Sequence, residues 1–190
     1  YSVRLQIGFL GIEKFAAWAV LFSVVNWVLF LDFGIANGLR NQVAVALSKA
    51  DDNLIKKLIS TGYFVSSVIT IIFICILGVT LLIFLPSELL GIDAKKIPEA
   101  NLAIVSLFIL IVFAFLFGTI NQVLHAYQKS NLVTANQFLS NFFILCSLII
   151  MEHFLDSNLL FVSLAVGGSI CTSYLITTYF FFKINKNVKP

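Results

Sequence analysis

Residues 59–85 read ISTGYFVSSVITIIFICILGVTLLIFL and contain no Asp, Glu, Lys, Arg or His. An α-helix rises about 1.5 Å per residue, so this stretch is long enough to cross the roughly 30 Å hydrocarbon core of a membrane. A membrane-spanning β-strand would alternate apolar and polar residues, whereas VITIIFICIL at residues 68–77 has only one polar residue. The stretch therefore predicts a transmembrane helix.

Four more uncharged stretches extend this pattern along the chain, at residues 15–31, 100–124, 132–151 and 159–182. Hydrophobic residues make up 60% of the sequence and charged residues 11%, and the mean hydropathy of +1.03 exceeds that of water-soluble domains. Buried helices of a large soluble protein are the alternative, but every face of each helix would then need covering. We predict an all-α integral membrane protein, a polytopic helical bundle with helices at about 15–47, 58–85, 100–125, 132–151 and 159–182.

The first of these helices is longer than a perpendicular crossing requires. Gly34 and Gly38 are its predicted hinges, because glycine loosens a helix and lets a neighbour approach closely. Asp51 and Asp52 then offer N-terminal caps for the next helix. The chain is therefore expected to bend or to leave the membrane near the two glycines.

Charged residues fall into two sets that alternate along the chain. One set comprises Arg40, Lys49, Lys56, Lys57, Lys129, Lys183, Lys186 and Lys189. The other comprises Arg4, Lys14, Lys95 and Lys96 together with Glu13, Glu88, Asp93, Glu99, Glu152 and Asp156. The positive-inside rule places the first set, and with it the C-terminal end of this chain, in the cytoplasm. The net charge of +3 is too small to indicate a nucleic-acid partner.

Two predicted helices carry polar stripes when successive residues are rotated by about 100°. The stripes are Ser60, Tyr63, Ser66, Ser67 and Thr70, and Thr134, Asn136, Gln137, Ser140 and Asn141. In lipid such groups must face other helices or a water-filled cavity. Hydrogen bonds between helices, each worth roughly 1 kcal/mol or less, explain single Ser or Thr residues, whereas the clustered amides are harder to explain that way. In the last helix, Ser163, Gly167 and Cys171 repeat small residues at four-residue spacing, which permits close helix packing.

The motif DFGIANGLRN at residues 32–41 is the best functional candidate, because ionisable groups are costly at membrane depth. In a continuous helix, Asn37, Arg40 and Asn41 share one face, and Asp32 lies too far along the axis to pair with Arg40. Arg40 could instead extend to lipid phosphates at the cytoplasmic interface. Arg4 presents the same choice between a cavity and an anchor at the outer surface.

No catalytic pattern is present: the sequence lacks a glycine-rich nucleotide loop, HExxH, a CxxC pair and a nucleophile with its base. We therefore expect no enzyme and no cofactor. His125 and His153 belong to opposite membrane faces in the predicted topology, so they cannot share a metal site. Cys75, Cys146 and Cys171 lie inside apolar segments and imply no disulfide framework.

Two stretches resemble a known family. Residues 8–41, GFLGIEKFAAWAVLFSVVNWVLFLDFGIANGLRN, resemble the start of bacterial polysaccharide-repeat flippases of the Wzx type, in the superfamily that includes multidrug and toxin extruders. The shared elements are Leu10-Gly11, Glu13 to Phe15, Trp18, Leu31 to Gly34 and Asn37 to Asn41. Residues 121–129, NQVLHAYQK, look like the family's junction between its fourth and fifth helices.

The resemblance implies a transporter of two six-helix lobes around a central cavity, of which residues 1–190 would be most of the N-terminal lobe. Residues 1–11 would end its first helix, and the C-terminal lobe would be absent. The implied substrate is an undecaprenyl-pyrophosphate-linked oligosaccharide, moved across the bacterial cytoplasmic membrane for assembly of O-antigen, capsule or exopolysaccharide. Membrane lipid, a polysaccharide polymerase and chain-length machinery are the implied partners.

On this interpretation Arg4 and Arg40 face the pyrophosphate, because a guanidinium can donate two hydrogen bonds to phosphate oxygens. The predicted cavity lining is Asn37, Asn41, Gln137 and Asn141. A cation-coupled drug extruder of the same architecture is one alternative, with Asp32 as its ion-coupling residue. A membrane scaffold for glycan-assembly enzymes is another, although a dry interior rich in small residues would suit it better than clustered amides.

Overall fold

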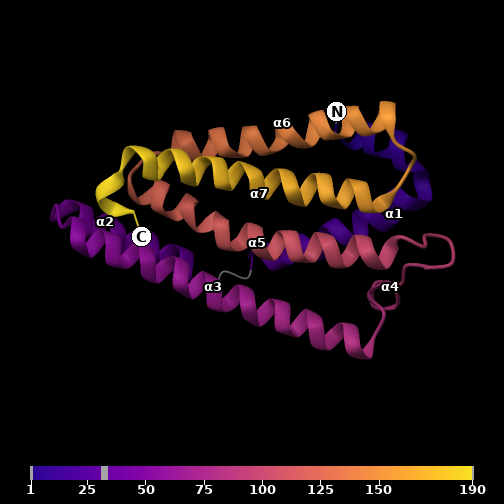
Figure 1. Ribbon diagram of the computed structural model, residues 1–190, viewed down its shortest axis with the longest axis horizontal. Coiled ribbons are helices and arrows are strands. Elements are labelled where there is room, and N and C mark those ends of the chain that lie inside the picture. Colours follow the sequence, from indigo (N-terminus) through magenta and orange to yellow (C-terminus); the bar gives the residue numbers. More distant parts are fainter. Residues whose placement is uncertain (1, 31–33, 190) are drawn as a thin grey trace.

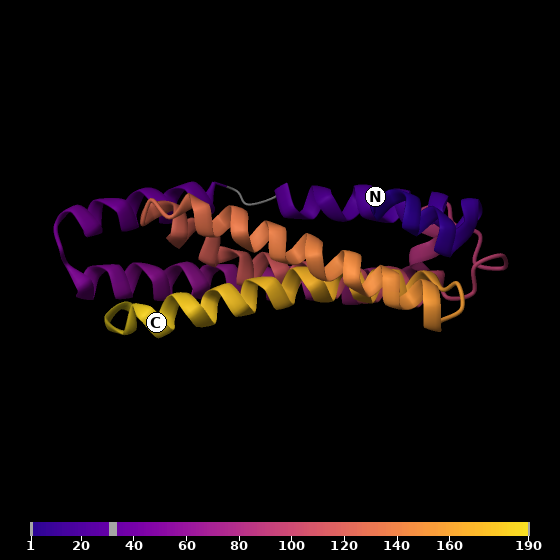
Figure 2. The ribbon, with the colours of Figure 1, turned by 90° about the horizontal axis from the view of Figure 1, so that it is seen from above.

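The computed structural model describes residues 2–30 and 34–189. The helices are α1 (Ser2–Phe30), α2 (Ile35–Ser48), α3 (Asp52–Ile83), α4 (Pro86–Leu89), α5 (Ala100–Ala126), α6 (Ser130–Phe154) and α7 (Leu159–Ile184), followed by the 3-10 helix η1 (Lys186–Val188). The described residues contain no strand. The long helices lie side by side in an elongated bundle (Figures 1 and 2).

Five described stretches are long and apolar enough to cross a membrane, namely Val3–Val24 and the helices α3, α5, α6 and α7. This confirms the predicted all-α polytopic membrane bundle. Val3–Val24 includes Gly11, whose φ of 73° and ψ of 170° are not helical. We therefore assign that crossing to residues 12–30, which at about 1.5 Å per residue measure about 28 Å.

Gly11 is the point at which α1 reverses direction. Its positive φ is a conformation that favours glycine, and the chain turns back there at one end of the bundle (Figure 1). An arm of residues 2–10 consequently lies against the bundle beside the arm of residues 12–30. Helix α1 is therefore a hairpin-like pair of arms and not one straight helix.

A second break separates α1 from α2. Gly34 has a φ of 75° and directly precedes α2, whereas Gly38 lies inside α2 and does not interrupt it. Asp32 lies outside the described residues. Beyond α2, the carboxylate of Asp51 caps α3 by accepting a hydrogen bond from the Leu54 N–H at 2.9 Å. That cap lets α3 begin at Asp52, about two turns before the apolar stretch starts.

Helix α5 occupies the centre of the bundle and contacts α1, α2, α3, α4, α6 and α7. Its closest neighbour is α7, as the small residues of α7 predict. A Cβ placed on Gly167 would lie 2.6 Å from Leu110 Cβ, and the Cys171 thiol donates to the Leu110 carbonyl at 3.0 Å. No side chain can fit at residue 167 without moving one of these helices.

The polar stripe of α3 also faces the interior. Ser66 and Thr70 are buried, and the Ser66 hydroxyl lies 2.8 Å from the Thr119 hydroxyl of α5. Thr70 donates to the Val112 carbonyl at 3.4 Å. The stripe therefore joins α3 to α5, which is the packing role open to single Ser and Thr residues.

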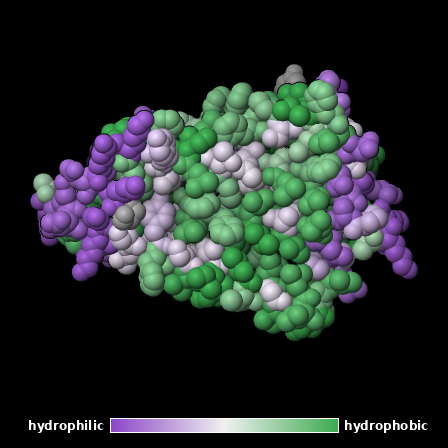
Figure 3. Space-filling model, viewed as in Figure 1, coloured by the Kyte–Doolittle hydropathy of each residue, from purple (hydrophilic) through white to green (hydrophobic). Residues whose placement is uncertain are grey.

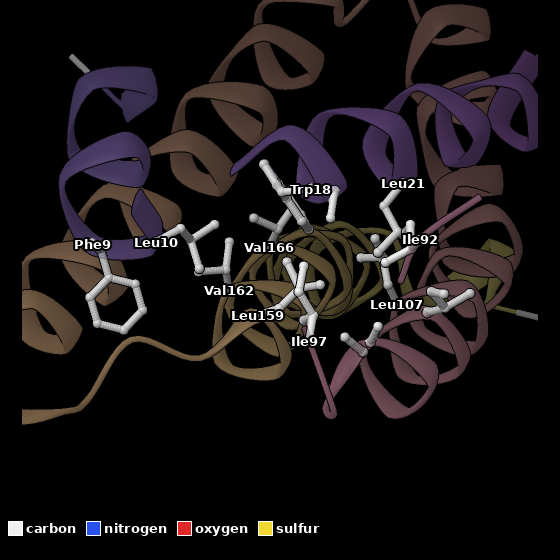
Figure 4. Packing of buried hydrophobic residues seen from close by; sticks show 14 of the residues in the cluster. Phe9, Leu10, Trp18, Leu21, Ile92, Ile97, Leu107, Leu159, Val162 and Val166 are labelled. Carbon is white, nitrogen blue, oxygen red and sulfur yellow. The ribbon is translucent and has the colours of Figure 1, made fainter. Parts of the chain in front are cut away.

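Two apolar clusters fill the bundle, one toward each end. The first joins α1, α5 and α7, and Figure 4 shows Leu10 and Trp18 from the two arms of α1 directed toward Val162 and Val166 of α7. The second joins α2, α3, α5, the end of α7 and η1, with Val43 and Ile59 almost completely buried. Apolar packing therefore runs the length of the molecule.

The polar surface lies at the two ends, with a hydrophobic band between them (Figure 3). We call the end formed by the α2–α3 turn, the α5–α6 turn and the C-terminus the basic end. The opposite end, formed by Gly11, residues 84–99 and residues 155–158, is the mixed-charge end (Figure 1). Most of the two sequence-defined charge sets follow this division. Arg4 lies about 10 Å along the helix from Gly11, toward the middle of the bundle.

At the mixed-charge end, one ion pair joins three parts of the chain. Lys14 Nζ lies 2.8 Å from Glu99 Oε1 and donates to the Ser157 carbonyl at 2.7 Å. The Ser157 hydroxyl donates to the Leu10 carbonyl at 3.3 Å, and the Leu159 N–H donates to Glu99 at 3.4 Å. The start of α5 and the α6–α7 connection are thereby tied to α1 on both sides of its turn.

Substitution of Gly167 tests the close approach of α5 and α7. We expect Gly167→Ala to lower the free energy of unfolding by about 1–3 kcal/mol, because the added methyl overpacks against Leu110. Gly168→Ala is the matched control, since its Cβ would meet nothing within 4 Å. Thermal unfolding in detergent measures both, and equal stability of the two variants would contradict the packing.

The Glu99 carboxylate makes the stability of the mixed-charge end dependent on pH. Burial acts to raise its pKa, but hydrogen bonds from Lys14 and from backbone N–H groups outweigh burial and lower the pKa. Because the pKa is lower in the folded than in the unfolded protein, the ionised carboxylate stabilises the fold at pH values above the ordinary carboxyl pKa. That stabilisation is lost as the pH falls through the folded-state pKa.

We therefore expect Glu99→Gln to reduce stability at neutral pH by on the order of 1 kcal/mol and to weaken the loss of stability on acidification. Glu88→Gln, at an exposed position of the same end, should change neither quantity. Thermal midpoints recorded from about pH 7 to about pH 4 provide the measurement. An unchanged acid response in Glu99→Gln would show that this carboxylate does not hold the end together.

Candidate functional site

A pocket of about 630 Å³ lies between the two arms of α1 and the helices α6 and α7. Its lining is Val3, Gln6, Phe15, Trp18, Ala19, Phe22, Ser23, Asn141, Ile144, Leu145 and Val166. The turn at Gly11 creates this pocket, because it brings Gln6 of the first arm to the same space as Ser23 of the second.

Aromatic side chains form one wall of the pocket. Trp18 is almost fully buried against α7, and its ring stacks on that of Phe22 with the centroids 5.6 Å apart. Figure 4 shows Trp18 beside Val166, at the border between the pocket and the apolar cluster. The indole is therefore packed on its far side, whereas Phe22 of the same wall is partly exposed.

The polar groups of the pocket are neutral. Gln6 is nearly buried, Asn141 is exposed to the pocket, and the Ser23 hydroxyl donates to the Ala19 carbonyl at 2.8 Å. Amides can both donate and accept hydrogen bonds, so they suit hydroxyl-rich neutral ligands such as sugars. No Asp, Glu, Lys or Arg is among the described lining residues.

Of the six predicted substrate-binding residues, Asn141 lines this pocket. Arg4 and Arg40 do not line it; both are exposed, one on the first arm of α1 and the other on α2. Asn37, Arg40 and Asn41 share one face of α2, as their spacing predicts, and all three are exposed. The opposite face of α2 carries the buried residues Leu39, Val43 and Ala46.

The amide cluster of α6 divides into a packed part and an exposed part. Asn136 and Ser140 are buried, and Asn136 accepts a hydrogen bond from the Thr177 hydroxyl of α7 at 2.9 Å. Gln137 is exposed one turn before Asn141 and does not line the pocket. Asn136 therefore has a structural partner, while Gln137 and Asn141 remain available to a ligand.

Sequence reasoning missed Gln6, Phe15, Phe22 and Ser23 as pocket residues. The sequence predicts that residues 1–11 are the end of an element, and Arg4 is its only candidate binding residue there. The signal was Gly11 itself, between two apolar stretches, because a reversal there places the side chains of the first arm opposite those of the second. Lys14 and Glu99 were placed at one membrane face, but their pairing was not predicted.

Among the described residues, no three His, Cys, Asp or Glu side chains gather in a way that could hold a metal ion. His125 lies in the last turn of α5 at the basic end, and His153 lies in the last turn of α6 at the mixed-charge end.

Part of this chain is similar to one known protein. A stretch of 44 residues is 41% identical to a protein of Yersinia pseudotuberculosis described as "Putative O-antigen export protein". The match covers 23% of this chain and 10% of that protein, so it spans about a tenth of the relative's length. No family model and no solved structure matches the chain. The membrane-helical fold and this similarity fit a multi-pass membrane transporter.

Two neighbouring amides of α6 should differ in their effect on stability. Asn136→Ala removes the acceptor of the Thr177 hydroxyl, and we expect the free energy of unfolding to fall by about 1 kcal/mol. Gln137→Ala, at an exposed position of the same helix, should stay within about 0.5 kcal/mol of the unmodified protein. Thermal unfolding in detergent measures both variants. A larger loss of stability in Gln137→Ala than in Asn136→Ala would contradict the structural role assigned to Asn136.

Proposed function

We propose that this chain belongs to a flippase that moves undecaprenyl-pyrophosphate-linked oligosaccharide repeat units across the bacterial cytoplasmic membrane. The observation that carries this proposal is the 44-residue similarity to the protein described as "Putative O-antigen export protein". The five membrane-spanning stretches and the resemblance of residues 8–41 to Wzx-type flippases support it. The residues described would form most of the N-terminal lobe of a two-lobe transporter.

The distribution of polar groups fits a substrate with two chemically different parts. Gln6 and Asn141 would bind sugar hydroxyls in the neutral pocket. Arg4 and Arg40 lie outside that pocket and would meet the pyrophosphate, whose transfer into a low dielectric needs compensating positive charge. Asn37, Asn41 and Gln137 are exposed and would extend the polar path on α2 and α6.

The proposed orientation places the basic end in the cytoplasm. Lys129, Lys183 and Lys186 are at this end, which agrees with the positive-inside rule. The substrate would enter from that side, where lipid-linked repeat units are assembled. The polysaccharide polymerase would act on it at the mixed-charge end.

The scaffold alternative has less support than a transporter. The drug-extruder alternative rests on Asp32, which lies outside the described residues. A scaffold would favour a dry interior, whereas the pocket of about 630 Å³ offers Gln6, Ser23 and Asn141 to a polar ligand. A transporter of polar cargo accounts for this pocket better than a scaffold does.

Complementation of a flippase-deleted bacterium tests the proposed function. The gene that encodes the complete protein, expressed in a host with a matching glycan, should restore surface polysaccharide and remove accumulated lipid-linked repeat units. Stable membrane insertion without restored export would refute the flippase function.

Single substitutions in the complementing protein locate the binding groups. We expect Asn141→Leu to reduce surface glycan about tenfold, because it replaces a hydrogen-bonding amide of the pocket with an apolar side chain. Asn131→Leu is the matched control on the same helix, since Asn131 is exposed and does not line the pocket. Arg4→Ala and Arg40→Ala should abolish export, with partial rescue by Lys, and protein levels by immunoblotting must stay unchanged.

A further inference from the structure

A second hollow lies at the basic end, between α6 and α7. It shares no lining residue with the pocket of about 630 Å³. This groove has a volume of about 340 Å³. Its walls include Leu132 and Leu139 of α6 and Ile176 and Phe180 of α7, and Lys129 lies at its end. Asn136 and Thr177 also line the groove, but they are hydrogen-bonded to each other. The α6–α7 groove is therefore mainly apolar and has a cation at its end.

The dimensions of the groove match one leaflet of a bilayer. Lys129 and Leu139 are ten positions apart, which corresponds to about 15 Å along a helix and to about half of the hydrocarbon thickness. Leu132 is 40% exposed and Phe180 is 56% exposed, so the apolar walls are open at the surface of the bundle. A ligand could enter sideways from the membrane.

The cation at the end of the groove is held in place by aromatic rings. Lys129 Nζ lies 5.8 Å from the ring centroid of Tyr127 and 5.9 Å from that of Phe181. It forms no ion pair with a carboxylate in the described parts of the chain. Its charge is therefore available to an anion at the membrane interface.

A polar hollow of about 430 Å³ adjoins the groove and shares Ile184 and Asn185 with it. Lys183 and Lys186 line this hollow, together with Asp52. Taken with Lys129, the two hollows carry three cations and one anion. An apolar groove next to a basic polar hollow suits an anionic amphiphile, which has an apolar chain and a charged headgroup.

We propose that the α6–α7 groove and its adjoining hollow bind one anionic glycerophospholipid. An acyl chain lies along Leu132, Leu139 and Phe180, the phosphate lies at Lys129, and the polar headgroup occupies the adjoining hollow. Basic pockets between membrane helices are suited to such headgroups. The length of the groove, about one leaflet, favours a glycerophospholipid over a polyprenyl chain. This site does not depend on the proposed transport function.

Native mass spectrometry of the complete purified protein tests this site with phosphatidylglycerol and phosphatidylcholine as probes. We expect phosphatidylglycerol to bind preferentially, and Lys129→Gln to weaken its binding about fivefold, as expected for loss of one cation at an anionic headgroup. Lys129→Arg should retain binding. Lys96→Gln, at the mixed-charge end, is the matched control and should leave binding unchanged.

A second pair of variants tests the groove without changing charge. Ala135→Phe places a ring in the groove and should weaken phosphatidylglycerol binding, whereas Thr134→Phe, at an exposed neighbour outside the groove, should not. Equal binding of the two lipids, or binding unaffected by both Lys129→Gln and Ala135→Phe, would overturn the proposal. Displacement of phosphatidylglycerol by undecaprenyl phosphate at stoichiometric concentration would also overturn it, in favour of a polyprenyl occupant.

Discussion

The close approach of α5 and α7 is the constraint on which the rest of the bundle depends. Gly167 lets the Leu110 side chain reach the backbone of α7, and the Cys171 thiol reaches the Leu110 carbonyl in the next turn. Lipid provides no hydrophobic force that would drive two apolar helices together, so contact at this distance has to supply the attraction through packing. Because α5 contacts all six other α-helices, its position against α7 determines where each of them can lie.

The pocket depends on two features at the opposite end from the α6–α7 groove. Gly11 reverses α1, and the Lys14–Glu99 ion pair joins the reversed chain to the start of α5. This pair is partly screened from solvent, with side chains 26% and 16% exposed, so it holds the turn more firmly than a surface pair would. Both arms of α1 line the pocket, so its shape depends on how this turn is held.

Polar side chains in this bundle have two different roles, which burial separates. Ser66, Thr70 and Asn136 are buried, and each has a hydrogen-bond partner on a neighbouring helix. Asn141 and Gln137 are exposed on the same helix as Asn136. Cations are separated from these amides, since Arg4 and Arg40 lie on other elements.

The sequence by itself determined the membrane-spanning helices, the division of charges between two ends and the close packing at Gly167. Uncharged length, charge position and small-residue spacing are local properties of a chain, and in lipid they leave few alternatives to a helix. Only the tertiary structure decided that Lys14 pairs with Glu99, that Asn136 is structural while Asn141 lines a pocket, and that Gln6 lies beside Ser23. Each of these depends on the reversal at Gly11 or on the rotation of α6 against α7. Helical periodicity defines the faces of a helix, but only packing between helices decides which neighbour each face meets.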